Sequence, residues 1–378
     1  MLLVSEPIVG EEEKAALADV IDSGWLTMGD RVRAFEQAFA EAHGAADSVA
    51  VNSCTAALHL ILHALGLGPG DEVLVPALTF VATANCVLYV GATPVFVDIE
   101  SADVPLMSLA DAEARCTART KAVILVHFAG YLPDREAWQA FARKRGLMLI
   151  EDAAHAPGLR QVGTFGEAAA FSFYGNKNMT TAEGGAVIAR DAHLLETIRQ
   201  ARGHGMTSGT RQRLNARTPT YDVTMLGFNY RMNELQAAIG LVQLRKLTAW
   251  NEIRRALVAQ YRRALAEYCP SVTAPFAQPR TSSFHIMPIV LPAGANRQEV
   301  IGKLRDNGIQ TTIHYTPVHL MSLYRELFPA VRLPRTEDFA AREVTLPLHP
   351  RMDAGTVERV ATTLARAVQA EATAEAVP

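Results

Sequence analysis

One lysine of this sequence stands apart from the other basic residues. Only six of the 36 basic residues are lysines, and Lys177 lies in a short polar loop, Gly175-Asn176-Lys177-Asn178, after the aromatic run Phe171-Ser172-Phe173. The other lysines lie mostly in amphipathic, helix-like surroundings, where a solvated amine is expected. Lysine forms Schiff bases with carbonyl compounds and with pyridoxal phosphate. A solvated loop amine is the alternative for this segment taken alone.

A second candidate is the turn Ser53-Cys54-Thr55, which opens a predicted helix directly after an apolar strand. The unpaired N–H groups and the dipole of a helix N-terminus suit a phosphate, and Thr55 would add a hydroxyl. The alternative is that Ser53 or Thr55 only caps the helix.

A third candidate is Asp152, which follows the strand-like run Leu147–Ile150. Its carboxylate could pair with a ring nitrogen, or it could be a helix cap or a partnered structural acid. Ligands of open α/β sheets bind at the carboxyl ends of the strands. A phosphate site, a strand-end aspartate and a loop lysine, in this order, are what a pyridoxal-phosphate enzyme needs.

The elements that position these residues alternate between strands and helices over the first two thirds of the chain. This alternation predicts an α/β fold with a mostly parallel sheet covered on both faces. Helices are expected at Thr55–Leu67, Thr83–Val90 and Arg135–Arg145, and strands at Val49–Asn52, Val73–Val75, Pro94–Asp98, Ala122–His127, Leu147–Ile150, Ala168–Phe173 and Gly185–Ala189.

The pattern changes after about residue 200. Arg199–Thr220 is rich in Gly, Arg and Thr and is expected to be a long loop, whose Arg202, Arg211, Arg213 and Arg217 could bind a diphosphate or remain solvated. A long helix is expected at Asn233–Leu265. Strands at His285–Leu291 and Thr311–His314 and helices at Arg297–Asn307 and Thr356–Val368 then predict a smaller α+β domain. We therefore expect a large domain over residues 1–250 and a small one over residues 251–378.

Composition excludes several classes of protein. The 378 residues carry a formal net charge of −3, so no broad basic surface for nucleic acid is expected. No apolar run approaches the ~18 residues that span a bilayer, and the N-terminal apolar stretch is too short for a signal peptide. The four cysteines share no metal-ligand spacing, so we expect reduced thiols, no bound metal and a cytoplasmic location.

The chain resembles the DegT/StrS type of sugar aminotransferases, which are pyridoxal-phosphate enzymes of fold type I. The resemblance runs nearly end to end. It rests on a series of motifs in order: Gly24–Gly29, Asn52–His59, Gly68–Val73, Thr79–Asn85, Gly91–Asp98, Glu151–Ala156, Phe171–Phe173 with Lys177-Asn178, Ala182–Gly185, Gly227–Met232 and Ile313–Tyr315.

The resemblance implies roles around the cofactor. Lys177 would form the Schiff base with pyridoxal 5'-phosphate and, once released, move the proton of the transamination. Asp152 would pair with the pyridine nitrogen and keep it protonated. Phe80 would stack on the cofactor ring, where the alternative is a core phenylalanine. His155, where many relatives have Gln, would lie near the phenolic oxygen of the cofactor, and its alternative is a satisfied buried histidine.

The resemblance also implies how the phosphate and the substrate are held. The amide of Cys54, together with Thr55 and Ser172, would hold the phosphate. Asn229 would reach the phosphate from the other subunit, which implies a homodimer with shared active sites. Thr27, His314 and Tyr315 would border the sugar pocket. The implied fold is a large domain with a mostly parallel seven-stranded sheet flanked by helices, followed by a smaller C-terminal α+β domain.

The function implied is amino transfer from L-glutamate to a nucleotide-linked keto sugar, giving an amino sugar and 2-oxoglutarate. His155 and the Tyr174-Gly175-Asn176 run favour carbon 4 of a 4-keto-6-deoxyhexose. A 3-keto sugar or a keto-inositol is the alternative acceptor. Some relatives carry His in place of the lysine and act as dehydratases, so Lys177 favours transamination. Lys177, Asp152 and Ser172 also argue against a non-catalytic sugar-nucleotide sensor.

Overall fold

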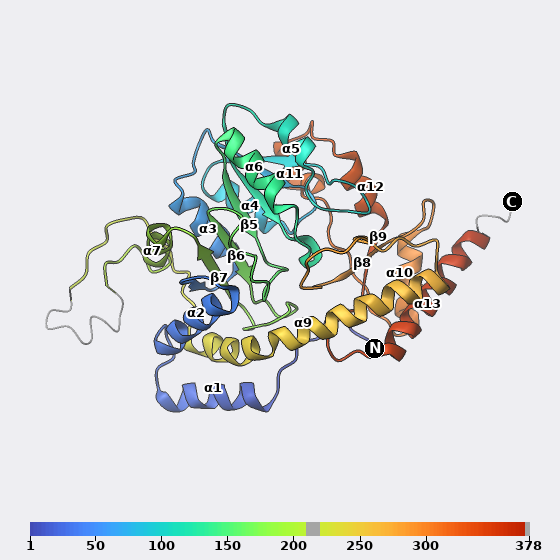
Figure 1. Ribbon diagram of the computed structural model, residues 1–378, viewed down its shortest axis with the longest axis horizontal. Helices are drawn as coiled ribbons and strands as arrows, with labels where there is room; N and C mark the ends of the chain where they lie inside the picture. The colour runs from blue at the N-terminus through green and yellow to red at the C-terminus, as the bar shows by residue number, and fades with distance from the viewer. Residues whose placement is uncertain (209–219, 375–378) are drawn as a thin grey trace.

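A seven-stranded sheet forms the centre of the protein in the computed structural model, which describes residues 1–208 and 220–374 (Figure 1). Its spatial order is β1-β7-β6-β5-β4-β2-β3. β7 is antiparallel to both of its neighbours, and every other adjacent pair is parallel, which confirms the expected mostly parallel sheet. The strands are β1 (Val49–Val51), β2 (Glu72–Pro76), β3 (Thr93–Val97), β4 (Thr120–Val126), β5 (Met148–Asp152), β6 (Ala168–Ser172) and β7 (Gly185–Ala189).

Alternating side chains of these strands fill two hydrophobic layers, one on each face of the sheet. In β2, Val73 and Val75 belong to one layer and Leu74 to the other. This burial on both faces accounts for the apolar runs from which the strands were predicted. The first layer is covered by α3 (Cys54–Ala64), α4 (Ala82–Tyr89) and α7 (Ala192–Ala201), and the second by α2 (Asp30–His43), α5 (Leu109–Arg115), α6 (Arg135–Arg145) and the first half of α9 (Glu234–Tyr268).

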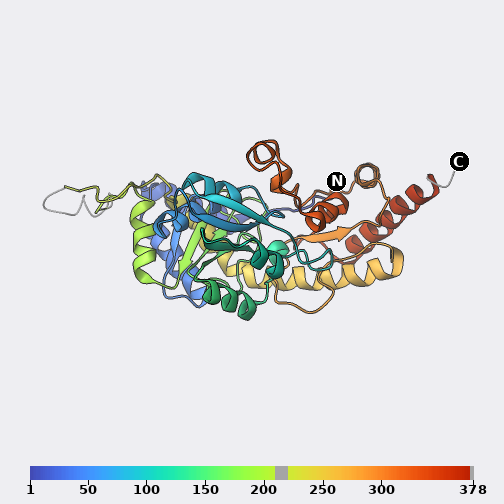
Figure 2. The ribbon, with the colours of Figure 1, turned by 90° about the horizontal axis from the view of Figure 1, so that it is seen from above.

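The long helix α9 links the sheet to a second core. Asn233 and Gln236 form a capping box at its start. Leu247 packs in the sheet layer, whereas Leu257 and Leu265 pack in the second core. Figure 2 shows this helix extending along both parts of the molecule. The helix α1 (Glu11–Ser23) lies along the outer side of α9 (Figure 1).

The second core surrounds a two-stranded antiparallel sheet of β8 (Met287–Val290) and β9 (Glu343–Leu346). It is completed by α10 (Arg297–Asp306) and α13 (Ala354–Ala374). The start of the chain also lies here, since the Leu2 amide donates to the Gly308 carbonyl over 2.8 Å. The short helices α11 (Ser322–Leu327) and α12 (Pro334–Arg342) precede β9. The division of the chain at residue 250 stays a prediction.

Two expectations about the second half of the chain are wrong. Thr311–His314 is no strand, because only Thr312 pairs with Thr345 of β9 and the next ladder donor, the His314 amide, bonds to the side chain of Glu343 instead. Part of the predicted loop Arg199–Thr220 is helical, since α7 continues to Ala201. Residues 209–219 of that loop lie outside the described residues.

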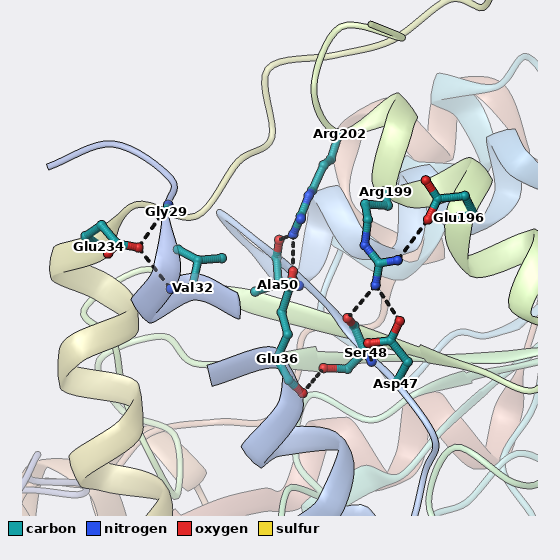
Figure 3. Close-up of polar contacts among 10 residues, drawn as sticks. All are labelled: Gly29, Val32, Glu36, Asp47, Ser48, Ala50, Glu196, Arg199, Arg202 and Glu234. Carbon is teal, nitrogen blue, oxygen red and sulfur yellow. Dashed lines mark hydrogen bonds and ion pairs between the residues drawn. The ribbon is translucent and has the colours of Figure 1, made fainter. Parts of the chain in front are cut away.

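The sequence offered two hypotheses for Arg202, a diphosphate ligand or a solvated loop charge, and both are wrong. It is 4 % exposed, pairs with Glu36 of α2 and donates to the Ala50 carbonyl of β1 (Figure 3). Its position at the end of α7, directly over β1, explains this burial. Arg202 therefore ties α7 to α2 and the sheet. The other three arginines considered for the diphosphate, Arg211, Arg213 and Arg217, lie outside the described residues.

Candidate active site

Three segments bring polar groups to the carboxyl edge of the sheet. The strand β5 ends at Asp152, β6 ends at Ser172 just before the Lys177 loop, and α3 begins at Cys54. The Cys54 thiol lies 4.0 Å from a carboxylate oxygen of Asp152. Lys177 is near enough to both side chains for their charges to act on its pKa. The sequence hypothesis that these segments meet at one edge is thus confirmed in geometry, while their roles stay predictions.

Asp152 is a buried carboxylate at the end of a central strand. One of its oxygens accepts a hydrogen bond from the Thr83 hydroxyl over 2.7 Å, and the other accepts from the Ala154 amide over 3.2 Å. Burial raises the pKa of Asp152, although these bonds and the nearby Lys177 oppose the shift. A cationic N–H placed against this carboxylate would restore its ionised form, which is what a protonated pyridine nitrogen offers.

The Lys177 side chain is partly buried, and so differs from the fully solvated loop amine considered as the alternative. The loop that carries it is tight, with the Lys177 amide bonded to the Tyr174 carbonyl over 3.0 Å. The side-chain amine has no hydrogen-bond partner among residues 1–208 and 220–374. Burial lowers the pKa of Lys177 to about 8, although Cys54 and Asp152 act in the opposite direction. An amine with a pKa near neutrality is suited to act as a nucleophile and as an acid–base group.

The start of α3 has the form of an anion site. The Ser53 hydroxyl accepts from the Ala56 amide over 3.1 Å, so Ser53 is the helix cap. The amides of Cys54 and Thr55 have no bonds to other described residues and remain available to a ligand. Gly185 of β7 lies against this turn, and a Cβ added there would come within 2.7 Å of the Cys54 nitrogen. The glycine therefore keeps the cradle open.

Strand register brings Ser172 to the same cradle. Ser172 of β6 pairs with Gly185 of β7, and Gly185 pairs with Val51 of β1, two residues before Ser53. The groups at this edge fit pyridoxal phosphate: helix amides and hydroxyls for the phosphate, a carboxylate for the ring nitrogen and a lysine for the carbonyl.

Phe80, His155 and Tyr315 line the other side of this edge. Phe80 is 59 % exposed, which excludes the core phenylalanine considered as its alternative. Its ring centroid lies 6.2 Å from that of Tyr315. The Tyr315 hydroxyl lies 2.9 Å from Nε2 of His155, and Nδ1 of His155 accepts from the Ala129 amide over 3.3 Å. Burial lowers the pKa of His155 well below its usual range, so the ring is neutral.

Two residues of β9 that sequence analysis did not single out hold His314 in place. The His314 amide donates to one carboxylate oxygen of Glu343 over 2.8 Å, and its Nδ1 lies 2.8 Å from the Thr345 hydroxyl. Glu343 is almost fully buried. The signal that could have revealed it is a lone acid heading the apolar strand Glu343–Leu346.

Thr27 and Asn229 are not brought to Lys177 within this chain. Thr27 is exposed in the loop between α1 and α2, which Glu234 anchors through bonds to the amides of Gly29 and Val32 (Figure 3). Asn229 is exposed on a segment that lies beside β1, where its carbonyl accepts from Asn52 over 3.4 Å. In the part of the chain that the structure describes, no hydrogen bond joins either side chain to the lysine.

The described residues also set limits on other kinds of site. Across residues 1–208 and 220–374, no group of three or more His, Cys, Asp or Glu side chains is arranged to bind a metal ion. No helix in these ranges has the length and apolar character needed to cross a membrane. All four cysteines are free thiols.

The fold and the groups at this sheet edge define a pyridoxal-phosphate enzyme of fold type I. The chain belongs to the DegT/DnrJ/EryC1/StrS aminotransferase family, whose sequence profile matches residues 7–365. It is a pyridoxal-phosphate-dependent sugar aminotransferase.

Solved structures of relatives superpose over nearly the whole chain. PseC of Helicobacter pylori, an aminotransferase involved in the biosynthesis of pseudoaminic acid, is 32 % identical, with a TM-score of 0.91 over 98 % of this chain and 99 % of its own. DesV of S. venezuelae, solved with a ketimine intermediate, is 36 % identical, with a TM-score of 0.86 over 95 % and 94 %. The putative sugar aminotransferase Spr1654 of Streptococcus pneumoniae, in its PLP form, is 29 % identical, with a TM-score of 0.87 over 97 % and 98 %.

Proposed function

We propose that the enzyme transfers the amino group of L-glutamate to a nucleotide-linked keto sugar, at carbon 4 of a 4-keto-6-deoxyhexose. The products are an amino sugar and 2-oxoglutarate. The observation that carries the proposal is the partly buried amine of Lys177, which has no hydrogen-bond partner among the described residues and lies near Asp152. The same edge also offers His314 and Tyr315 as polar groups for a sugar. The likeness to PseC, described as involved in the biosynthesis of pseudoaminic acid, and to Spr1654, described as a putative sugar aminotransferase, supports a sugar as acceptor.

In this proposal each residue at the edge has a separate task. Bound pyridoxal phosphate supplies the electron sink that makes proton loss next to the amino group possible. The amides of Cys54 and Thr55, with the Ser172 hydroxyl, bind the phosphate. Asp152 holds the proton on the ring nitrogen, and Lys177 carries the proton to and from the carbon that bears the amino group. A pKa of about 8 lets the Lys177 amine both accept and return that proton near neutral pH.

We further propose a homodimer in which Asn229 serves the active site of the partner subunit. The Asn229 side chain is exposed, whereas its backbone lies beside the strand that leads to the phosphate cradle. Large apolar side chains near this segment are also exposed, among them Leu226 at 72 % and Val223 at 54 %. Such an apolar surface is typical of a subunit interface. The free cysteines and the nucleotide-linked substrate are consistent with a cytoplasmic location.

A panel of nucleotide-linked keto sugars tests the substrate and the position of amination. The purified enzyme receives glutamate with a 4-keto sugar, a 3-keto sugar or a keto-inositol in separate reactions, and mass spectrometry follows the amine. We expect amine from the 4-keto-6-deoxy sugar. Amine formed only from the 3-keto sugar or the keto-inositol would reject the position and leave amino transfer intact.

A further inference from the structure

A buried hydrogen-bonded relay runs from β9 to the ring of His314. The Thr345 hydroxyl lies 2.5 Å from one carboxylate oxygen of Glu343 and 2.8 Å from Nδ1 of His314. The second carboxylate oxygen of Glu343 accepts from the His314 backbone amide. Glu343 is 1 % exposed, and the Thr345 side chain is fully buried. The two relay members on β9, Glu343 and Thr345, are therefore shielded from water.

The far side of the His314 ring faces the candidate active site. His314 is partly exposed, and its ring centroid lies 4.7 Å from that of Tyr315 and 6.3 Å from that of His155. Its Nε2 has no hydrogen-bond partner in the described residues and is not among the buried unpaired atoms. Nε2 is therefore the ring atom that a ligand at this edge would meet.

The direction of the relay decides what Nε2 offers. When Glu343 is ionised it can only accept hydrogen bonds, so the Thr345 hydroxyl donates to it. The Thr345 oxygen then accepts a hydrogen bond from the Nδ1–H group of His314, and Nε2 presents a lone pair. When Glu343 is protonated it donates to Thr345, which donates in turn to Nδ1; Nε2 then carries the proton. One buried proton thus reverses the hydrogen-bond polarity of an atom in the site.

Glu343 is placed to change its protonation near neutral pH. Burial raises the pKa of Glu343 to about 8, while the bonds from Thr345 and His314 and the charge of Arg297 on α10 oppose that shift. Charges from other elements also act on this cluster. Burial and the charge of Lys177 lower the pKa of His314 to about 3, so the imidazole stays neutral and changes only its tautomer. His285, also buried and neutral, lies on the β8 side.

The neighbouring residue Tyr315 has a fixed polarity. The Ala129 amide donates to Nδ1 of His155, so the neutral ring carries its proton on Nε2 and donates it to the Tyr315 oxygen. The Tyr315 proton is then free for a ligand. With Glu343 ionised, His314 and Tyr315 together offer one acceptor and one donor, which is the complement of a sugar hydroxyl or a vicinal diol. With Glu343 protonated they offer two donors.

We propose that Glu343 and Thr345 are positioning residues that make His314 Nε2 an acceptor for a hydroxyl of the sugar substrate. This inference rests on the proposed function. Sugar binding then requires the ionised form of Glu343, so it is coupled to release of that proton. Because only the ionised fraction binds well, the KM for the keto sugar should decrease about tenfold for each unit by which the pH rises toward about 8. Above about pH 8 the KM should become constant.

The decisive variant is Glu343→Gln. The amide oxygen of Gln can accept from the His314 backbone, and its NH₂ group then donates to Thr345, which fixes His314 in the Nε2–H form. We expect this variant to have a high sugar KM without the pH dependence, whereas single-turnover reaction with glutamate keeps its rate. Thr345→Ser should retain the pH dependence, and Thr345→Val should lose it. A sugar KM in Glu343→Gln that varies with pH as in the wild type would overturn the proposal.

Nitrogen NMR of the holoenzyme labelled with ¹⁵N-histidine separates this inference from the proposed function. The His314 signals, assigned by their loss in His314→Asn, should exchange between the two tautomers near pH 8 in the wild type and stay in one form in Glu343→Gln. Tautomer exchange without amination of any keto sugar would reject the substrate and with it the proposed role in sugar binding. A His314 tautomer that does not change with pH would overturn the relay proposal even where a keto sugar is aminated. The same would follow if the glutamate reaction depended on pH as strongly as the sugar KM does.

Discussion

The Tyr315 hydroxyl lies 2.9 Å from Nε2 of His155, although the two residues are 160 positions apart in the chain. Both ring nitrogens of His155 are engaged, since Nδ1 accepts from Ala129. Ala129 has a left-handed backbone with φ of 56°, which costs free energy in a residue other than glycine and turns its amide toward the imidazole. In this arrangement Tyr315, not His155, has a proton to offer a ligand.

Tyr315→Phe should therefore weaken the sugar half-reaction specifically. Loss of one hydrogen bond to substrate is worth about 1 kcal/mol, which raises the sugar KM about fivefold. Stopped-flow measurement of each half-reaction separates the two substrates. The exposed tyrosine Tyr89 at the end of α4 offers a control in Tyr89→Phe, which should change neither step. An equal loss in the glutamate reaction would place the Tyr315 proton on the cofactor or the donor instead.

Lys177→Ala should abolish turnover and the absorbance of the lysine-bound cofactor near 400 nm, a rough figure for cofactor chemistry. The variant should still fold, because the partly buried position disfavours the charged form of the Lys177 amine. Removing it relieves an unfavourable burial. Absorbance spectra and turnover of the purified variant check this prediction, and full transaminase activity would contradict the role of Lys177.

The same burial predicts a pH-dependent gain in stability for the apoenzyme of Lys177→Met. The folded pKa of about 8 lies below the unfolded value, so the protonated amine costs stability at all pH values below about 8. That cost is up to about 3 kcal/mol and disappears as the pH rises from 8 to above 10. Denaturant unfolding at pH 7 and pH 10 measures it. Lys144→Met, at an exposed lysine of α6, should show no such gain.

Asp152→Asn tests whether the carboxylate acts by its charge. The substitution keeps the shape and the bond from Thr83 but removes the negative charge that holds a proton on the ring nitrogen. We expect weaker cofactor binding and a rate lowered by about 3 to 4 kcal/mol in activation free energy. Cofactor titration and single-turnover rates measure the two effects. Near-native turnover would make Asp152 a structural residue only.

The elements that could be predicted from the sequence are those whose structure is set by local patterns of apolar side chains, and not by hydrogen bonds to distant side chains. The strands of the sheet were predictable because apolar side chains fill both faces, and α6 and β7 were predicted with their observed bounds. The Thr311–His314 prediction failed because a side chain, Glu343, takes the bond that a strand neighbour would have taken. Local periodicity carries no signal for such a long-range partner.

The candidate site shows the same division. Lys177, Asp152 and the Ser53–Thr55 turn could be found because each follows a strand and brings a distinctive side chain to one edge. The burial of Arg202 against Glu36 could not be read from a segment rich in Gly and Arg. Nor could the coupling of His155 to Tyr315, since it needs the relative placement of two parts of the chain.

The last prediction concerns the assembly of the active site. If Asn229 serves the partner subunit, a hybrid of one Lys177→Ala protomer and one Asn229→Ala protomer contains one site with both defects and one with neither. Mixing the two inactive proteins under conditions that exchange subunits should therefore restore activity, at about half the wild-type value per hybrid. Light scattering and the recovered rate check the prediction together.

Two controls make this experiment decisive. Mixing each variant with itself should restore nothing, because no intact site can form. A hybrid of Lys177→Ala with Asn52→Ala tests the neighbouring asparagine, whose side chain bonds to Asn229 within the same chain. If Asn229 acted within its own subunit, each site of the Lys177–Asn229 hybrid would carry one defect and the mixture would stay inactive. A monomer that is active at assay concentration would also contradict the shared site, because the cradle at Cys54 would then be complete without a second chain.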